Sequence, residues 1–201
     1  LDEEFSIGDT VKINLSDMDL ISWKEDLLHD VHILQMLLKE MKKITPEHDL
    51  KLKTLMQIID EKIQHPINPG NRKILIFSAF SDTVEYLYNH LSPYVKEKYD
   101  IHTAKIVGND VNKNTAGLKN DMLTLLTCFS PCSKERDLTM PEMTTDIDLL
   151  IATDCISEGQ NLQDCDFVVN YDIHWNPVRV IQRFGRVDRI GSKNEQIQMV
   201  N

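Results

Sequence analysis

Three polar side chains near the C-terminal end of the sequence recur at the spacing of a helix. Gln182, Arg186 and Arg189 are separated by four and then three residues, so at about 100° per residue they fall on one narrow stripe. Arginine presents a planar fork of donors that matches the oxygens of a phosphate group. The spacing therefore predicts a phosphate-binding face, although an amphipathic helix with a solvated basic face fits the same pattern.

The neighbouring residues predict the helix that would carry this stripe. Asn176 is a good N-cap, and Pro177 suits the first helical position. The apolar residues expected on the opposite, buried face are Val180, Phe184 and Val187. A helix packed through that face would leave its polar stripe accessible to a ligand.

Two apolar runs upstream of the helix are typical of buried parallel strands. They cover residues 149–152 and 167–169, and a polar loop follows each of them. Open α/β sheets bind ligands at the carboxyl ends of their strands. The loop after the first run contains Thr153 and Gly159, and a glycine there lets a backbone N–H approach a ligand closely.

The order of motifs in this region resembles a known family. The sequence reads T-D-x-x-S-E-G-x-N-L from Thr153, N-Y-D-x-x-W-N-P from Asn170, and Q-R-x-G-R-x-D-R-I-G from Gln182. These motifs resemble motifs V and VI of superfamily-two helicases, and they are most similar to the Swi/Snf-type ATPases, especially their bacterial RapA-like branch. Residues 73–91 resemble motif IV of the same family. The resemblance implies an α/β fold, a RecA-like three-layer domain with a mainly parallel central sheet.

The resemblance also implies roles for single residues. In the family, the motif VI arginines reach across a cleft to the γ-phosphate of ATP, which makes Arg186 and Arg189 the expected arginine fingers. Gln182 is expected to position an arginine or the attacking water. The residues expected to border the nucleotide are Glu158, Gly159 and Asn161. Those expected along the nucleic-acid backbone are Ser78, Thr153 and Trp175.

Purely structural roles compete with several of these assignments. A single tryptophan such as Trp175 is more often a core residue, and Ser78 and Ser81 suit turns and helix caps. Arg183 has a local carboxylate as its alternative partner. Asp188 is expected to orient the arginines through a salt bridge.

The remaining segments predict the frame around these motifs. Residues 1–70 are predicted to form an N-terminal arm and helices that pack on the lobe of residues 71–201, because apolar residues recur at spacings of three and four from Leu20 to Met41. Residues 118–129 predict a further helix. Residues 130–146 contain two prolines and many polar residues, which predicts a mobile surface loop.

Composition limits the class of protein. Apolar residues make up 41% of the 201 residues, which suits a globular domain, and no apolar run approaches the ~20 residues of a membrane span. The net charge of −10 argues against a protein that coats nucleic acid through a basic surface. Cys128 and Cys132 have no second pair at ligand spacing, so no metal site is predicted, and reduced thiols in a cytoplasmic protein are the default.

Two motifs needed for phosphoryl transfer are missing from the sequence. It contains no G-x-x-x-x-G-K-[ST] phosphate loop and no convincing acidic box for Mg²⁺. The family carries both on a first RecA-like lobe. We therefore expect a second lobe, excised from a longer ATP-dependent translocase or helicase, that uses ATP and Mg²⁺ bound mainly by the first lobe. Its expected partner is nucleic acid, with double-stranded DNA favoured and single strands and RNA left open. The alternative is an α/β interaction module that has lost its chemistry, against which the intact motif VI residues argue.

Overall fold

A computed structural model describes residues 6–7, 13–14, 16, 18–108, 111–156, 159–173 and 176–201. The chain divides into two compact units, Leu1–Lys53 and Thr54–Asn201. Among the described helices, none is both long enough and apolar enough to cross a membrane.

The first unit contains a small sheet and a long helix. Strand β1 (Ser6–Ile7) pairs with β2 (Ile13–Asn14) in an antiparallel arrangement, and α1 spans Leu20–Met41. The carboxylate of Asp19 caps α1 by accepting a hydrogen bond from the backbone N–H of Ser22 at 3.1 Å. The structure describes every residue of α1 and none of them is buried. The predicted helix is therefore present, and its packing on the lobe stays a prediction.

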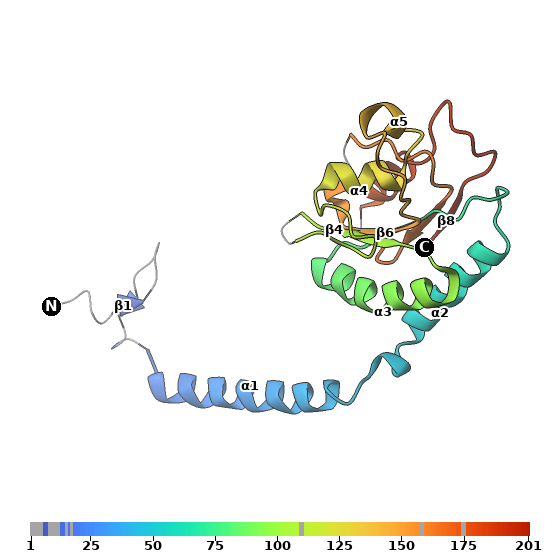
Figure 1. The fold of residues 1–201 in the computed structure, drawn as a ribbon. Helices are drawn as coiled ribbons and strands as arrows, with labels where there is room; N and C mark the ends of the chain where they lie inside the picture. The colour runs from blue at the N-terminus through green and yellow to red at the C-terminus, as the bar shows by residue number, and fades with distance from the viewer. Residues whose placement is uncertain are drawn as a thin grey trace. The chain divides into compact units, whose positions relative to one another are not determined.

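The second unit is built around a mostly parallel sheet (Figure 1). Within the described residues this sheet has six strands in the order β5, β4, β6, β3, β7 and β8. In that order their bounds are Lys113–Asn114, Thr103–Ile106, Leu149–Ala152, Ile74–Phe77, Phe167–Asn170 and Gln198–Val200. Strand β5 is antiparallel to β4, and the other neighbours are parallel. The carboxyl ends of β6, β3 and β7 therefore meet at one edge of the sheet.

Helices cover both faces of this sheet (Figure 1). On one side lie α3 (Ser81–Tyr99) and the part of α2 (Leu50–Gln64) that belongs to this unit, and on the other lies α4 (Met122–Phe129). The shorter helices of this unit are α5 (Arg136–Thr139), η4 (Asp154–Ile156) and α6 (Pro177–Phe184), and η3 (Pro46–His48) belongs to the first unit. This arrangement is the RecA-like three-layer α/β fold with an N-terminal helix that the sequence predicts, and the fold prediction is confirmed.

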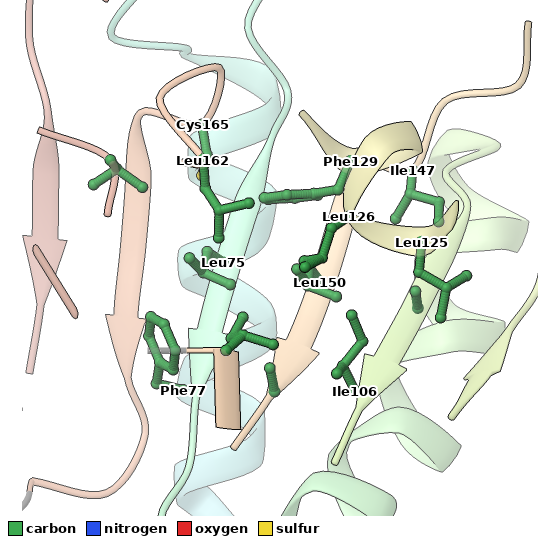
Figure 2. Close-up of a cluster of buried hydrophobic side chains, with 14 of the residues drawn as sticks. Leu75, Phe77, Ile106, Leu125, Leu126, Phe129, Ile147, Leu150, Leu162 and Cys165 are labelled. Carbon is green, nitrogen blue, oxygen red and sulfur yellow. The ribbon is translucent and has the colours of Figure 1, made fainter. Parts of the chain in front are cut away.

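A buried apolar cluster fills the space between the sheet and α4 (Figure 2). Alternate residues of the strands contribute to it, among them Leu75 and Phe77 of β3 and Leu150 of β6. The cluster also includes Leu162 and Val187, which lie in the loops of motifs V and VI. Each fully buried side chain of this size contributes about 1.5–3 kcal/mol. The core therefore holds the two motif loops as well as the sheet.

One helix runs through a proline, and another begins later than the sequence predicts. Helix α3 continues through Pro93 to Tyr99, because Leu91 and Val95 on both sides of the proline are buried and compensate for the lost backbone hydrogen bond. Helix α4 begins only at Met122, because the carboxylate of Asp121 accepts from the backbone N–H of Thr124 at 2.8 Å and caps the helix there.

Candidate functional site

Helix α6 begins as the sequence predicts. The side-chain oxygen of Asn176 accepts a hydrogen bond from the backbone N–H of Val178 at 3.0 Å, and Pro177 is the first helical residue. The N-cap prediction is confirmed.

The end of α6 differs from the prediction. The helix ends at Phe184, and Gly185 is its C-cap. Gln182 therefore lies on the helix, whereas Arg186 and Arg189 lie in the turns that follow. The prediction that these three residues share one helical stripe is therefore wrong. Gly185 lies within that stripe, and a glycine weakens a helix by about 1 kcal/mol relative to alanine and favours its termination.

Arg183 is a fully buried residue that anchors α6 to the sheet. Its Nε and Nη2 atoms donate to the two carboxylate oxygens of Asp154 at 2.6 Å and 2.8 Å, and its Nη1 donates to Oδ1 of Asn170 at 3.0 Å. Its guanidinium carbon lies 5.1 Å from the centre of the Phe77 ring. Because these partners stand at the ends of β6, β7 and β3, one side chain joins α6 to three strands. The carboxylate partner considered for Arg183 is the one observed.

The arginines of motif VI lie beside the motif V loop. The backbone oxygen of Arg186 accepts a hydrogen bond from the N–H of Leu162 at 3.0 Å, and the next residue, Val187, is fully buried. The Nε atom of Arg189 donates to the backbone oxygen of Gly185 at 3.2 Å. Both arginines are partly exposed. A backbone hydrogen bond therefore holds the two loops together. The Arg189 side chain contacts the turn to which it belongs.

The motif V loop has a backbone that requires a glycine. Gly159 adopts a φ of +71°, and the space where its side chain would point is open. Asn161 is partly buried, and its Oδ1 accepts from the backbone N–H of Gln163 at 3.3 Å. Glu158, the third residue expected near the nucleotide, lies outside the described residues.

Two residues expected along the nucleic acid are buried at the carboxyl edge of the sheet. The exposed fractions of Ser78 and Thr153 are 0% and 9%. The Oγ atom of Ser78 donates to a carboxylate oxygen of Asp172 and accepts from the backbone N–H of Phe80 at 3.2 Å. The Ser78 side chain therefore stabilises a turn, which agrees with the structural role that competed with nucleic-acid contact for this residue. Trp175 lies outside the described residues.

Comparison with known proteins identifies the family. Residues 50–191 match the family described as helicase conserved C-terminal domain. The chain belongs to this family. The match covers most of the chain and contains the sheet except β8, both motif loops and the Arg183 anchor.

Known relatives of this helicase C-terminal domain are much longer than the chain. It is 49% identical over 49 residues to the uncharacterized ATP-dependent helicase YqhH of Bacillus subtilis. The aligned segment covers 24% of this chain and 9% of that protein. It is 32% identical over 124 residues to the ATP-dependent RNA helicase eIF4A of Eremothecium gossypii, over 59% of this chain and 31% of that protein. The chain therefore spans no more than about a third of these relatives.

A solved structure supports the fold of the helicase C-terminal domain. The C-terminal part of the Fun30 ATPase domain superposes with a TM-score of 0.50 at 20% sequence identity, over 75% of this chain and 39% of that one. At this identity the likeness concerns the fold alone.

Sequence reasoning missed two residues that position motif VI in this helicase domain. Asp154 and Asn170 hold the guanidinium of Arg183, yet each is a single polar residue at a strand end and belongs to no periodic pattern. The available signal was their place in the T-D and N-Y-D motifs, each directly after an apolar run.

A cavity of about 580 Å³ lies at the amino edge of the sheet, opposite the carboxyl edge where Arg183 anchors α6. It is lined by residues that precede β3 and β6, including Lys73 and Asp148, and by Lys193. Neither arginine of motif VI lines it. We therefore place the candidate site of this helicase domain at the carboxyl edge, where α/β sheets bind ligands.

Proposed function

We propose that this chain is the second RecA-like lobe of an ATP-dependent nucleic-acid translocase or helicase. In this proposal Arg186 and Arg189 are arginine fingers that act on a nucleotide held mainly by a first lobe. The observation that carries it is the hydrogen bond from the Leu162 N–H to the Arg186 oxygen at 3.0 Å. Because this bond joins motifs V and VI through the backbone, nucleotide contacts from both loops would form one site.

The proposed chemistry is electrostatic stabilisation of phosphoryl transfer. Negative charge develops on the transferred phosphoryl oxygens, and positioned guanidinium groups offset it. Among the described residues, the buried Oε1 atom of Gln182 has no hydrogen-bond partner. Buried polar atoms usually have a hydrogen-bond partner, so a partner for this atom from outside the lobe is part of the proposal. Such a partner fits a role for Gln182 in holding an arginine or the attacking water. Gly159 and Asn161, with Glu158, would border the nucleotide, and Mg²⁺ would be bound mainly by the first lobe.

The branch of the family and the substrate are further parts of the proposal. The motif V and VI sequences favour the Swi/Snf-type ATPases and their bacterial RapA-like branch, and double-stranded DNA is the partner that we propose. Ser78, Thr153 and Trp175 would lie along its backbone, with the first two acting through the local backbone because their side chains are buried. Residues 1–70 would extend the lobe of residues 71–201 in a cytoplasmic protein. Several relatives are named as RNA helicases, so RNA is the competing substrate.

The test uses the full-length protein that carries this lobe. ATP hydrolysis is measured with saturating double-stranded DNA and with RNA for Arg186→Lys and Arg189→Lys. Arginine fingers contribute on the order of 10³–10⁵ in rate, and lysine lacks the planar fork, so both variants should lose most of kcat while their Tm stays unchanged. Arg179→Lys, the same change on α6 outside motif VI, is the matched control and should keep kcat.

The outcomes of this test separate the two candidate functions. Near-normal kcat in both arginine variants would remove the finger assignment. Absence of nucleic-acid-stimulated hydrolysis in the wild-type full-length protein would favour the interaction module that kept the fold and lost the chemistry. A larger stimulation by RNA than by DNA would change the proposed substrate.

A further inference from the structure

A turn at the start of segment 130–146 is bound to the motif V loop. The backbone N–H groups of Cys132 and Ser133 donate to the carboxylate of Asp164 at 2.6 Å and 2.9 Å. The Oγ atom of Ser133 donates to the backbone oxygen of Asn161 at 3.3 Å. These bonds fix the backbone directly before Lys134.

Lys134 extends from this turn to the same loop. Its Nζ atom donates to Oε1 of Gln160 at 2.6 Å, and the residue is partly buried. Within the part of the chain that the structure describes, neither Lys134 nor Arg189 forms an ion pair with a carboxylate. By contrast, the fully buried cations Lys62 and Arg183 are both paired with carboxylates.

The positive charge of Lys134 is held in an unfavourable environment. Burial lowers the pKa of Lys134, and the nearby positive charge of Arg189 lowers it further. A buried charge is normally compensated by a partner of opposite sign. Geometry brings the two side chains to one loop, because Lys134 donates to Gln160 and the backbone of Arg186 is bound to Leu162. Phosphate is a group that both lysine and arginine bind well.

We propose that Lys134 is a third phosphate-binding cation of the motif VI site, and that with Arg189 it takes a phosphate group of a nucleoside triphosphate. This inference rests on the proposed function, since that function supplies the nucleotide. It adds a residue that lies outside motifs V and VI and comes from the segment between α4 and β6. The bonds from Cys132 to Asp164 and from Ser133 to Asn161 hold Lys134 beside the motif V loop.

The experiment compares Lys134→Gln, Lys134→Arg and Arg189→Gln in the full-length protein. Lys119→Gln is the matched control, because Lys119 is an exposed lysine outside the motif loops. Loss of one charge-assisted hydrogen bond should lower kcat/KM for ATP by roughly 10- to 100-fold in Lys134→Gln. Lys134→Arg should recover most of this loss, and Lys119→Gln should match the wild type. Melting temperatures establish that each variant is folded.

A pH profile separates a charge on the nucleotide from a structural role. Among the described residues, Arg189 is the charged group that perturbs Lys134. Because the pKa of Lys134 lies below its ordinary value of 10.5, its charge is lost as the pH rises through that lowered value. Wild-type kcat/KM should therefore fall on the alkaline side, and Lys134→Arg should move this fall to higher pH. An unchanged profile in Lys134→Arg would overturn the inference.

The variants also distinguish failure of this inference from failure of the proposed function. Normal kcat/KM for ATP in Lys134→Gln, together with its loss in Arg189→Gln, would overturn the role of Lys134 and leave the arginine fingers intact. Normal values in both variants would overturn both. A loss in Lys134→Gln that appears only in the KM for nucleic acid would overturn the nucleotide as the ligand and assign Lys134 to a backbone phosphate.

Discussion

Arg183 and Asp154 form a two-point contact between motif VI and the end of β6, with N–O distances of 2.6 Å and 2.8 Å. The Arg183 side chain is fully buried, whereas 23% of the Asp154 side chain is exposed. This bidentate geometry fixes the direction of α6 as well as its distance from the sheet. The arginines proposed to contact the nucleotide follow directly after this anchored helix, so their position depends on the Arg183–Asp154 contact.

Arg183→Met should lower the free energy of unfolding by about 3–5 kcal/mol. The change removes one partner of a largely buried ion pair and leaves Asp154 without its guanidinium. Urea unfolding followed by circular dichroism measures the effect. Arg179→Met on the same helix, where the residue is only partly buried, should change stability by no more than about 0.5 kcal/mol. Equal midpoints for the two variants would contradict the anchoring role of Arg183.

Lys62 and Asp166 form a second buried pair, whose Nζ–Oδ1 distance is 2.6 Å and whose side chains are both 0% exposed. The contact is an ion pair rather than a hydrogen bond. Lys62→Met alone should cost about 3–5 kcal/mol, because it leaves a buried carboxylate uncompensated.

Lys62→Met combined with Asp166→Asn should recover much of that loss. The asparagine removes the buried charge and keeps an acceptor for Asn68, whose Nδ2 donates to Asp166 at 2.8 Å. A double-mutant cycle in urea provides the coupling energy between the two positions. Additive effects of the two single changes would show that the pair does not act as a unit.

The carboxylate of Glu85 connects α3 to two strands and should make stability depend on pH. Hydrogen bonds from Lys105, and then from Lys113 at 2.7 Å, lower the pKa of Glu85 below its ordinary value of 4.5. A carboxyl whose folded pKa is lowered stabilises the fold above its unfolded pKa, and this contribution is lost as the pH falls through the folded value. Unfolding experiments should therefore show stability decreasing below about pH 4.5.

Glu85→Gln tests this pH dependence. The variant should be less stable than the wild type at pH 7 by about 1.5–3 kcal/mol, since it loses hydrogen bonds to charged partners. The difference should shrink as the pH falls, because the wild-type carboxylate is then protonated. Tm is measured from pH 7 to pH 3 for both proteins. A difference that stays constant over this range would show that the carboxylate charge is not the cause.

The sequence predicts the strands of this lobe better than its helix ends. Residues 149–152 are predicted and observed as a strand with the same bounds, because a short apolar run covered on both faces has few alternatives. The end of α6 is different. The pattern from Gln182 to Arg189 fits a helix that Gly185 weakens. Termination at Gly185 also depends on tertiary contacts that no local pattern reports, such as burial of Val187 in the core.

The sequence predicts a candidate site at the carboxyl ends of the strands, but it does not predict the contacts within that region. In the structure α6 contacts the loops after β6 and β7 through Arg183, which donates to Asp154 and to the backbone oxygen of Asp172. The bonds from Ser133 to Asp164 and from Lys134 to Gln160 join residues that are about thirty positions apart across a segment predicted as a surface loop. Such pairings depend on the closure of that segment over motif V, and single-sequence periodicity contains no information about it.

Two glycines of the motif loops should differ in their sensitivity to substitution by alanine. Gly159 has a φ of +71°, whereas Gly185 has a φ of −63° and space for a Cβ atom 3.5 Å from the nearest oxygen, that of Ile181. Gly159→Ala should therefore lower the free energy of unfolding by about 1–2 kcal/mol through backbone strain, and Gly159→Asn should cost less, because asparagine tolerates left-handed backbone. Gly185→Ala should leave Tm unchanged, because the added methyl group makes an ordinary contact. Thermal unfolding of the three variants measures these effects, and a larger loss in Gly185→Ala than in Gly159→Ala would contradict the backbone described for both loops.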